Sequence, residues 1–409
     1  ILTGKIEIKI VCFVILTSLF LVVSTQKYYC SHASALMLMK RPAYEFSIKI
    51  LDRVSHETGG HFVFSPMSTW LQLMLLSDGA RGRTLSEIWK VTRHHKMKCF
   101  RSKIRDILNL TDKELKLMNR RSSVIVIDKL MKVNKRFKNE SEKHNGVKVL
   151  SLDFSDPEQA AAEANAVIES DMDGVITEGV YPTDFNYTVL LMMDTTYFRG
   201  DWKFPFNSVY TTVQPFYSQQ GEQLGDVKMM NQISYFNLVD IPRIKARVLE
   251  LPCSVDDRVS MLVFLPTEGT VFDIFFSLNA ITLRTIFNLY KQKGMQLVNV
   301  KLPRFKIITD VDTLPELLYD MGVKRVFYPH LADLKGISEY GVYASLMSQI
   351  ADIEVIEKGI TAKSVAEFLV TDKKNTATFY ADHPFAFLIV DKKTEMILFA
   401  GSYNTPSLY

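Results

Sequence analysis

The spacing of apolar residues predicts helices in the first part of the chain. Three segments repeat apolar residues at helical spacing and carry helix-end signals; they are residues 44–56, 66–77 and 156–172. Ser65 precedes the second segment as a cap residue, and Pro66 takes its first helical position, where a missing N–H leaves no hydrogen bond unmade. We therefore expect the fold to begin with helices.

Strand patterns dominate from about residue 188 onward. The segments rich in branched and aromatic residues are 188–198, 247–253, 259–266, 296–307, 385–391 and 395–403. No Pro-rich or Gly/Ser-rich linker divides the chain, and it contains no internal repeat. Helices followed by strands in one undivided chain predict a single α+β domain with large sheets.

The segment after Gly359 alternates with a period of two. Its uncharged face carries Ile360, Ala362, Ser364, Ala366, Phe368 and Val370, and both formal charges lie on the other face. This is the pattern of a half-buried strand. The alternation stops at the polar residues 372–375, where a trypsin-like protease would cleave Lys373-Lys374 if the pair were exposed. The stretch is therefore either a strand with a solvated turn or a loop that can be cut.

The uncharged residues 10–23 follow two lysines near the start of the sequence. The stretch is short for a membrane span and has the length of a secretory signal core. Cleavage could follow Thr25 or, farther from the apolar core, Ala35, so we expect a signal peptide over 1–25 that extends at most to 35. The alternative is an uncleaved membrane anchor. On the first interpretation the mature protein is secreted, extracellular and free of the membrane, and its domain spans 36–409.

Glycosylation motifs are compatible with secretion. Asn-x-Ser/Thr acceptors occur at Asn109, Asn139 and Asn186, so we expect a glycoprotein. The motif is common by chance, and a single acceptor would therefore be weak support.

The chain has four cysteines. Cys12 lies inside the signal, and Cys30 leaves with the signal only if cleavage is late. Cys99 and Cys253 are far apart and have no metal-ligand spacing, so we do not expect a disulfide-stapled fold. Stability should come from a hydrophobic core, for which the 47% hydrophobic and 23% charged residues are ordinary values.

Catalytic motifs are missing from the sequence. It has no Gly-x-Ser-x-Gly elbow, no His-Glu-x-x-His and no phosphate-binding loop. It also has no nucleic-acid-binding motif, and the formal charge of +4 is too small to indicate a partner. We expect a protein that is not an enzyme, with no cofactor, no metal and no nucleic-acid partner.

Ordered motifs run through the chain from about residue 40 onward. They are "FVFSPMSTWLQLMLLSDGARGRTLSEI" (62–88), "TTYFRGDWKFPF" (195–206), "VSMLVFLP" (259–266), "VNVKLPRFKI" (298–307), "LYDMGVKRVFYPHLADLKGIS" (318–338) and "ADHPFAFLIVDKKTEMILFAG" (381–401). In order and spacing they resemble the serpins, the superfamily of serine protease inhibitors. The resemblance implies a monomer with a large central, mainly antiparallel sheet, smaller sheets, surrounding helices and an exposed reactive loop at 357–379.

In serpins the segment that corresponds to the stretch after Gly359 is first an exposed reactive loop and, after cleavage, a strand. The resemblance implies that a protease cuts the loop and that the loop then inserts as a new strand in the large sheet. The hinge positions would be Glu357, Gly359, Ile360, Ala362, Ser364 and Ala366, and the reactive bond would join Lys373 to Lys374. A serine protease would form an acyl-enzyme at the Lys373 carbonyl, and insertion would compete with its hydrolysis.

Five further positions correspond to the region where the serpin sheet opens. Ser65, Ser68 and Trp202 match the family there. Asp194 and Gln349 depart from it, because serpins usually have Asn and His at these positions. The two side chains could still pair, but a buried carboxylate must be satisfied or protonated.

A basic stretch at 93–105 contains six Lys or Arg residues and no acid. If it is helical, His94, Lys98, Arg101 and Arg105 lie on one face, and its location resembles the region where some serpins bind sulfated polysaccharides. The alternative is a basic solvated helix, on which a glycan at Asn109 would crowd the same face.

The leading hypothesis is a secreted inhibitor of trypsin-like serine proteases that traps its target by loop insertion. Its rival is a non-inhibitory serpin that acts as a binding, carrier or signalling protein. Inhibitory members usually have Thr or Ser where this chain has Ile360, and overpacking a tight position costs about 1–3 kcal/mol, which favours the rival. The small residues Ala362, Ser364 and Ala366 favour the inhibitor.

Overall fold

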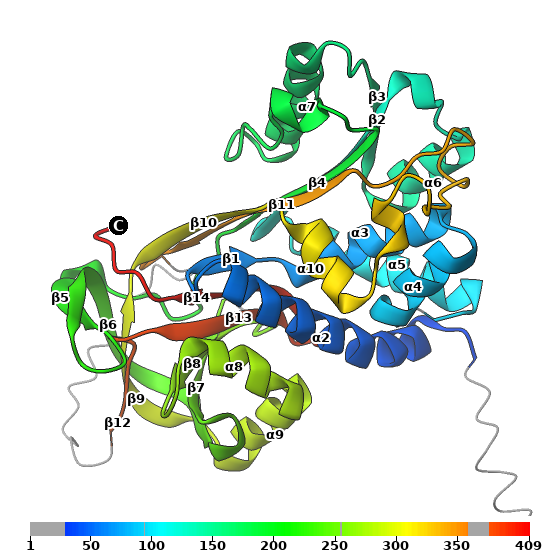
Figure 1. The fold of residues 1–409 in the computed structure, drawn as a ribbon. Coiled ribbons are helices and arrows are strands. Elements are labelled where there is room, and N and C mark those ends of the chain that lie inside the picture. The colour runs from blue at the N-terminus through cyan, green and yellow to red at the C-terminus, as the bar shows by residue number, and fades with distance from the viewer. Residues whose placement is uncertain (1–28, 94, 254–255, 359–375) are drawn as a thin grey trace, which may run out of the picture.

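A computed structural model of the protein describes residues 29–93, 95–253, 256–358 and 376–409. The helices are α2 (His32–Glu57), α3 (Pro66–Gly79), α4 (Gly82–Thr92), α5 (Lys98–Glu114), α6 (Lys135–Asn145), α7 (Pro157–Asp171), α8 (Val271–Ser277), α9 (Leu283–Lys293) and α10 (Leu314–Met321) (Figure 1). Within these residues, no helix combines the length and apolar character that crossing a membrane requires. The helices expected over 66–77 and 156–172 are confirmed, and Ser65 accepts a hydrogen bond from the Ser68 N–H at the start of α3.

The first helix is longer than the sequence pattern indicated. We expected a helix over 44–56, but α2 begins at His32 and continues through Pro42. A proline inside a helix removes one backbone hydrogen bond, so local rules favour a start after it. Here Ala35 and Met39 are buried before the proline, and their packing holds the extra turns in place.

One sheet contains five strands. Its order is β10 (Phe305–Val311), β11 (Leu346–Val355), β4 (Leu190–Phe198), β2 (Asn119–Asp128) and β3 (Lys148–Leu152). The neighbours β11 and β4 run parallel, as do β2 and β3, whereas the other pairs are antiparallel. In Figure 1, α7 covers one face of this sheet, and α3 and α10 lie against the other.

The remaining strands form a nine-stranded network. Its order is β1 (Phe62–Phe64), β14 (Met396–Tyr403), β13 (Phe385–Asp391), β8 (Val259–Pro266), β7 (Ala246–Pro252), β6 (Gln223–Ile241), β9 (Gln296–Pro303) and β12 (Ala377–Tyr380), with β5 (Thr212–Tyr217) on β6. The expected strand over 296–307 is divided, because β9 ends at Pro303 and β10 joins the five-stranded sheet. The α+β class with large sheets is confirmed.

Alternation along β4 places the core on both faces of the five-stranded sheet. Leu190 and Met192 pack into the main core, whereas Leu191 and Met193 pack into a smaller cluster under α7. Every residue of β4 is therefore buried, including Asp194. The same alternation decides which face each polar side chain of this sheet occupies.

Candidate functional site

We call the boundary between β4 and β11 the slot. It leads directly to the base of the predicted reactive loop. Glu357 follows shortly after β11 ends, and its backbone is fixed by the segment that follows β4. The indole N–H of Trp202 donates to the Ile356 carbonyl at 2.6 Å, and the Trp202 backbone N–H donates to the Lys358 carbonyl at 3.1 Å. Because Trp202 is itself buried, it anchors the start of the loop to the sheet.

The Glu357 side chain is held as well. Its Oε1 accepts a hydrogen bond from Thr211 Oγ1 at 2.8 Å, and Arg304 Nη1 lies 3.6 Å from its Oε2. These two contacts fix the position of Glu357, the first residue of the predicted hinge. The other predicted loop residues lie outside the described part of the chain; they are Gly359, Ile360, Ala362, Ser364, Ala366, Lys373 and Lys374.

The slot is closed by a parallel strand pair, in which Gln349 of β11 lies opposite Asp194 of β4. A strand that turned back from the end of β11 would run antiparallel to both neighbours. Inserting it here would replace one parallel ladder with two antiparallel ladders, and antiparallel pairing is slightly more stable per residue. The topology therefore favours the uptake of a further strand at the slot.

Gln349 and Asp194 do not bond to each other, although the sequence left that pairing open. The Gln349 Nε2 group donates to the Ser65 carbonyl at 3.0 Å and to Thr69 Oγ1 at 3.2 Å. Its Oε1 accepts from the Ser65 N–H at 2.6 Å. Gln349 thus ties β11 to the start of α3, and Asp194 must find other partners.

Asp194 is fully buried on the core face of β4. Neither carboxylate oxygen makes a hydrogen bond of normal geometry with another described residue, and Arg121 Nη1 lies 3.9 Å from Oδ1. Burial raises the pKa of Asp194 to about 6, against the opposing effects of Arg121 and of the nearby Ser123 and Ser68 hydroxyls. Close to neutral pH, this side of the slot holds a poorly compensated negative charge.

Arg121 divides its charge between two carboxylates. Its Nε and Nη2 donate to Asp112 Oδ2 at 3.1 and 2.9 Å. Asp112 belongs to α5, so one arginine connects a surface helix with the strand that borders the slot. The sequence reasoning missed Arg121 and Asp112, because nothing in their spacing links them to Asp194.

Acidic residues lie beside the basic face expected around α5. Lys98, Arg101 and Arg105 line a hollow together with the acidic residues Asp78, Asp106 and Glu140. Arg105 forms an ion pair with Asp78, and Arg101 donates to the carbonyls of His95 and Lys96 and lies over the Trp89 ring. His94 lies outside the described residues, and α5 begins only at Lys98. Tertiary contacts thus place acids beside a stretch that has none in its own sequence, and polyanion binding by Lys98, Arg101 and Arg105 stays a prediction.

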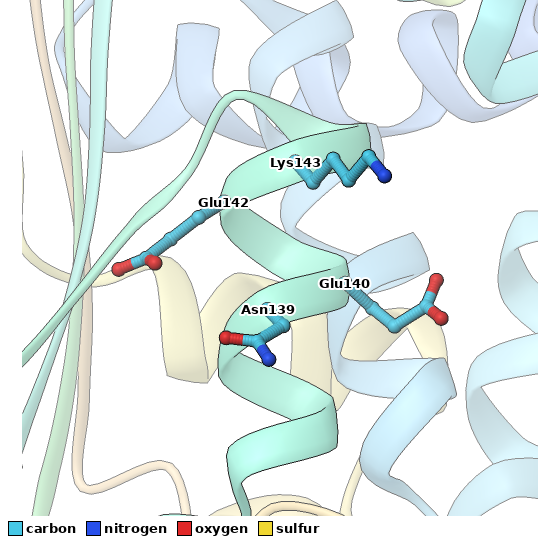
Figure 2. Close-up of a pocket in the computed structure, with 4 residues that line it drawn as sticks. All are labelled: Asn139, Glu140, Glu142 and Lys143. Atoms are coloured by element: carbon cyan, nitrogen blue, oxygen red, sulfur yellow. The ribbon is translucent and has the colours of Figure 1, made fainter.

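The three glycosylation acceptors lie on or near the surface. Asn109 of α5 is half-buried, whereas Asn139 of α6 and Asn186 are exposed. A surface hollow of about 590 Å³ is lined by Asn139, Glu140, Glu142 and Lys143, all from α6, and Figure 2 shows their side chains spreading in different directions. These residues do not converge on a point where a substrate could react. The hollow has no catalytic geometry, and Asn139 is open to solvent there.

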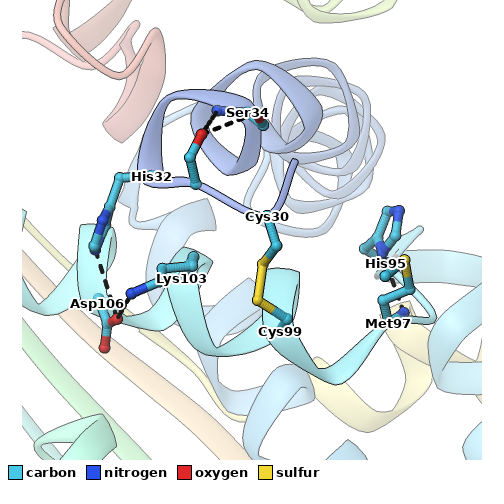
Figure 3. The surroundings of a disulfide bond; sticks show 9 residues. Cys30, His32, Ser34, His95, Met97, Cys99, Lys103 and Asp106 are labelled. Atoms are coloured by element: carbon cyan, nitrogen blue, oxygen red, sulfur yellow. Dashed lines mark hydrogen bonds and ion pairs between the residues drawn. A yellow bond between two sulfur atoms is a disulfide. The ribbon is translucent and has the colours of Figure 1, made fainter. Parts of the chain in front are cut away.

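Cys30 forms a disulfide with Cys99, which the sequence analysis did not predict. The bond joins Cys30, two residues before the start of α2, to the first turn of α5 (Figure 3). The two helices pack together, so cysteines 69 positions apart in the sequence become neighbours. Distance along the sequence was therefore a poor guide to pairing.

Cys253 is a free, buried thiol, and burial raises its pKa to about 12. We expect a non-reducing digest to yield one linked peptide pair containing Cys30 and Cys99. We also expect iodoacetamide to label Cys253 only after unfolding, because the thiolate fraction falls about a thousandfold when the pKa rises from 9 to 12. Mass spectrometry of native and urea-treated protein measures the linked peptide pair and the labelling of Cys253. Rapid labelling of native Cys253 would contradict the buried position.

Comparison with known proteins agrees with this architecture. A sequence model of the family described as "Serpin (serine protease inhibitor)" matches residues 42–406. A leukocyte elastase inhibitor of Xenopus tropicalis is 30% identical over 377 residues, which cover 88% of this chain and 97% of that protein.

Solved structures give the same result. Uncleaved ovalbumin matches with a TM-score of 0.79 and 26% identity, covering 90% of this chain and 100% of the other. Serpin48 of the insect Tenebrio molitor, described as highly specific, matches with a TM-score of 0.76 and 27% identity, covering 91% and 99%. Members of the matched family are in general protease inhibitors rather than enzymes, and some do not inhibit. The family model spans both sheets, the slot and the base of the loop, and the chain therefore belongs to the serpin family.

Proposed function

We propose that this protein is a secreted inhibitor that traps trypsin-like serine proteases by inserting its cleaved loop into the slot. The observation that carries the proposal is the parallel β4/β11 pair, whose second strand leads to an anchored segment at 356–358, the predicted base of the reactive loop. Lys373 would fill the acidic specificity pocket of the protease. Residues 360–371, with their uncharged face inward, would form the new strand.

The disulfide supports secretion. Disulfides form and persist in oxidising compartments and are rare in the cytosol. Signal cleavage after Thr25 would retain Cys30 and all of α2, whereas cleavage after Ala35 would remove Cys30 and the first turn of that helix. We therefore favour the earlier site. Glycosylation at Asn109, Asn139 and Asn186 belongs to the same proposal.

A non-inhibitory role is the second candidate. Ile360 is the observation in its favour, because a bulky residue at the first inserting position would slow insertion and allow the acyl-enzyme to hydrolyse. The protein would then be cut as an ordinary substrate. Polysaccharide binding stays a prediction, and the acids beside Lys98, Arg101 and Arg105 weaken it.

Incubation with trypsin distinguishes the two candidates. We expect a covalent complex that survives boiling in detergent. We also expect Lys373→Ala to slow complex formation about a hundredfold, because the buried charge in the specificity pocket loses its partner. Lys90→Ala, which changes an exposed lysine of α4, is the matched control and should react like the parent. Cleavage of the loop with full recovery of trypsin activity would reject inhibition.

A further inference from the structure

We propose that Glu354, Tyr197 and Tyr409 clamp the loop end of the slot shut and thereby set the rate at which the cleaved loop inserts. The inference rests on the proposed trapping function and adds its control. The clamp, with Arg199 as an auxiliary member, spans the two strands that insertion must separate.

Glu354 is the centre of the clamp. It is the penultimate residue of β11, and its side chain is only 18% exposed. Its Oε2 accepts a hydrogen bond from Tyr197 Oη of β4 at 3.3 Å, and Arg199 Nε lies 3.5 Å from the same oxygen. These contacts cross the slot at the end where the loop would enter.

Tyr409 closes the clamp from outside the sheet. It belongs to the segment after β14, and its hydroxyl donates to Glu354 Oε1 at 2.6 Å. Its ring also lies 5.4 Å from the Arg304 guanidinium, which pairs with Glu357 at the base of the loop. One tyrosine therefore contacts both the edge of the slot and the partner of the hinge residue.

Both tyrosines are fixed as donors. Burial and the neighbouring Glu354 raise the pKa of Tyr409 to about 12, and burial raises the pKa of Tyr197 as well. Each hydroxyl thus keeps its proton at physiological pH and faces a carboxylate. Hydrogen bonds to a charged acceptor are stronger than those between neutral groups.

The clamp acts before any new strand has paired. When β4 and β11 begin to separate, the bonds from Tyr197 and Arg199 must break, while the inserted ladder has not yet formed. Removing the clamp should therefore lower the free-energy barrier to insertion more than it changes the free energy of the final inserted state. The orientation of Glu354 also depends on Tyr409, so removing that hydroxyl should loosen the bond to Tyr197.

The test uses Tyr409→Phe and Tyr197→Phe, which each remove one hydroxyl and keep the ring. The matched control is Tyr328→Phe, at an exposed tyrosine whose ring contacts that of Tyr319 in α10 and not a clamp residue. With trypsin, we expect the ratio of trapped to merely cleaved protein to rise about tenfold in both clamp variants, which corresponds to about 1.4 kcal/mol on the barrier. An unchanged ratio in a parent protein that traps trypsin would overturn the clamp.

A second measurement stays informative if the parent traps no protease. In the uncut protein, hydrogen exchange of the backbone amides at 353–358 should be about tenfold faster in Tyr409→Phe than in Tyr328→Phe. An unchanged exchange rate rejects the clamp, whether or not the parent protein traps trypsin. Faster exchange without any trapping retains the clamp and rejects the proposed function.

Discussion

Cleavage after Lys373 is expected to raise the midpoint of thermal unfolding by more than about 20 °C, since each kcal/mol is worth about 2–4 °C in a large domain. Insertion of residues 360–371 would add about ten backbone hydrogen bonds at about 1 kcal/mol each. It would also exchange the parallel β4/β11 ladder for two antiparallel ladders. Calorimetry before and after limited trypsin treatment measures the shift.

Two variants make this measurement decisive. Ala366→Glu places a charge on the face that is predicted to turn inward without adding a trypsin site, so the nicked variant should melt at the temperature of the intact protein. Lys373→Ala combined with Lys374→Ala should resist cutting at this site and show no shift. If the nicked parent protein melts no later than the intact one, the loop does not insert and the trapping mechanism is wrong.

Replacing Asp194 with Asn is expected to stabilise the protein at neutral pH. The pKa of Asp194 is raised from 3.8 to about 6 in the folded state, so the native protein binds this proton more tightly than the unfolded chain. The contribution of Asp194 to the free energy of unfolding is therefore fully present below pH 4 and is lost as the pH rises through the folded-state pKa of about 6. The difference between the two pKa values corresponds to about 3 kcal/mol. Arg121 and Asp112 would remain as a balanced pair in the variant.

Urea unfolding of parent and variant at pH 4 and pH 7.5 measures this effect. We expect similar free energies of unfolding at pH 4, and a variant that is more stable by about 3 kcal/mol at pH 7.5. Asp320→Asn, at an exposed residue of α10, is the control and should follow the parent at both values. Burial also raises the pKa of Asp310 to about 6. Asp310 therefore lowers the free energy of unfolding as the pH rises in the parent and in both variants alike. A variant that is less stable at pH 7.5 would show that the Asp194 charge is fully compensated.

The candidate site shows how far local sequence rules reach. The family resemblance assigned Trp202 and Gln349 to the sheet-opening region and Glu357 to the loop hinge, and all three lie at or beside the slot. Their hydrogen-bond partners could not be assigned. Gln349 bonds to Ser65 and Thr69, which precede it by more than 250 residues and meet it only because α3 packs under β11.

The sequence by itself determined the elements and their class. Continuous runs of branched and aromatic residues defined β8 and β13 to the residue, because each strand is buried on both faces and bounded by polar or turn residues. Cap residues placed the start of α3 and α7, since capping depends on neighbours within one turn.

Only the tertiary structure decided which distant groups meet. It joined Cys30 to Cys99, gave Arg105 the acid that its own helix face lacks, buried Asp194 beside Arg121 and brought Tyr409 to Glu354. The physical reason is that periodicity and capping are energies of adjacent residues. Disulfides, ion pairs and raised pKa values depend instead on distances that are fixed when sheets and helices pack.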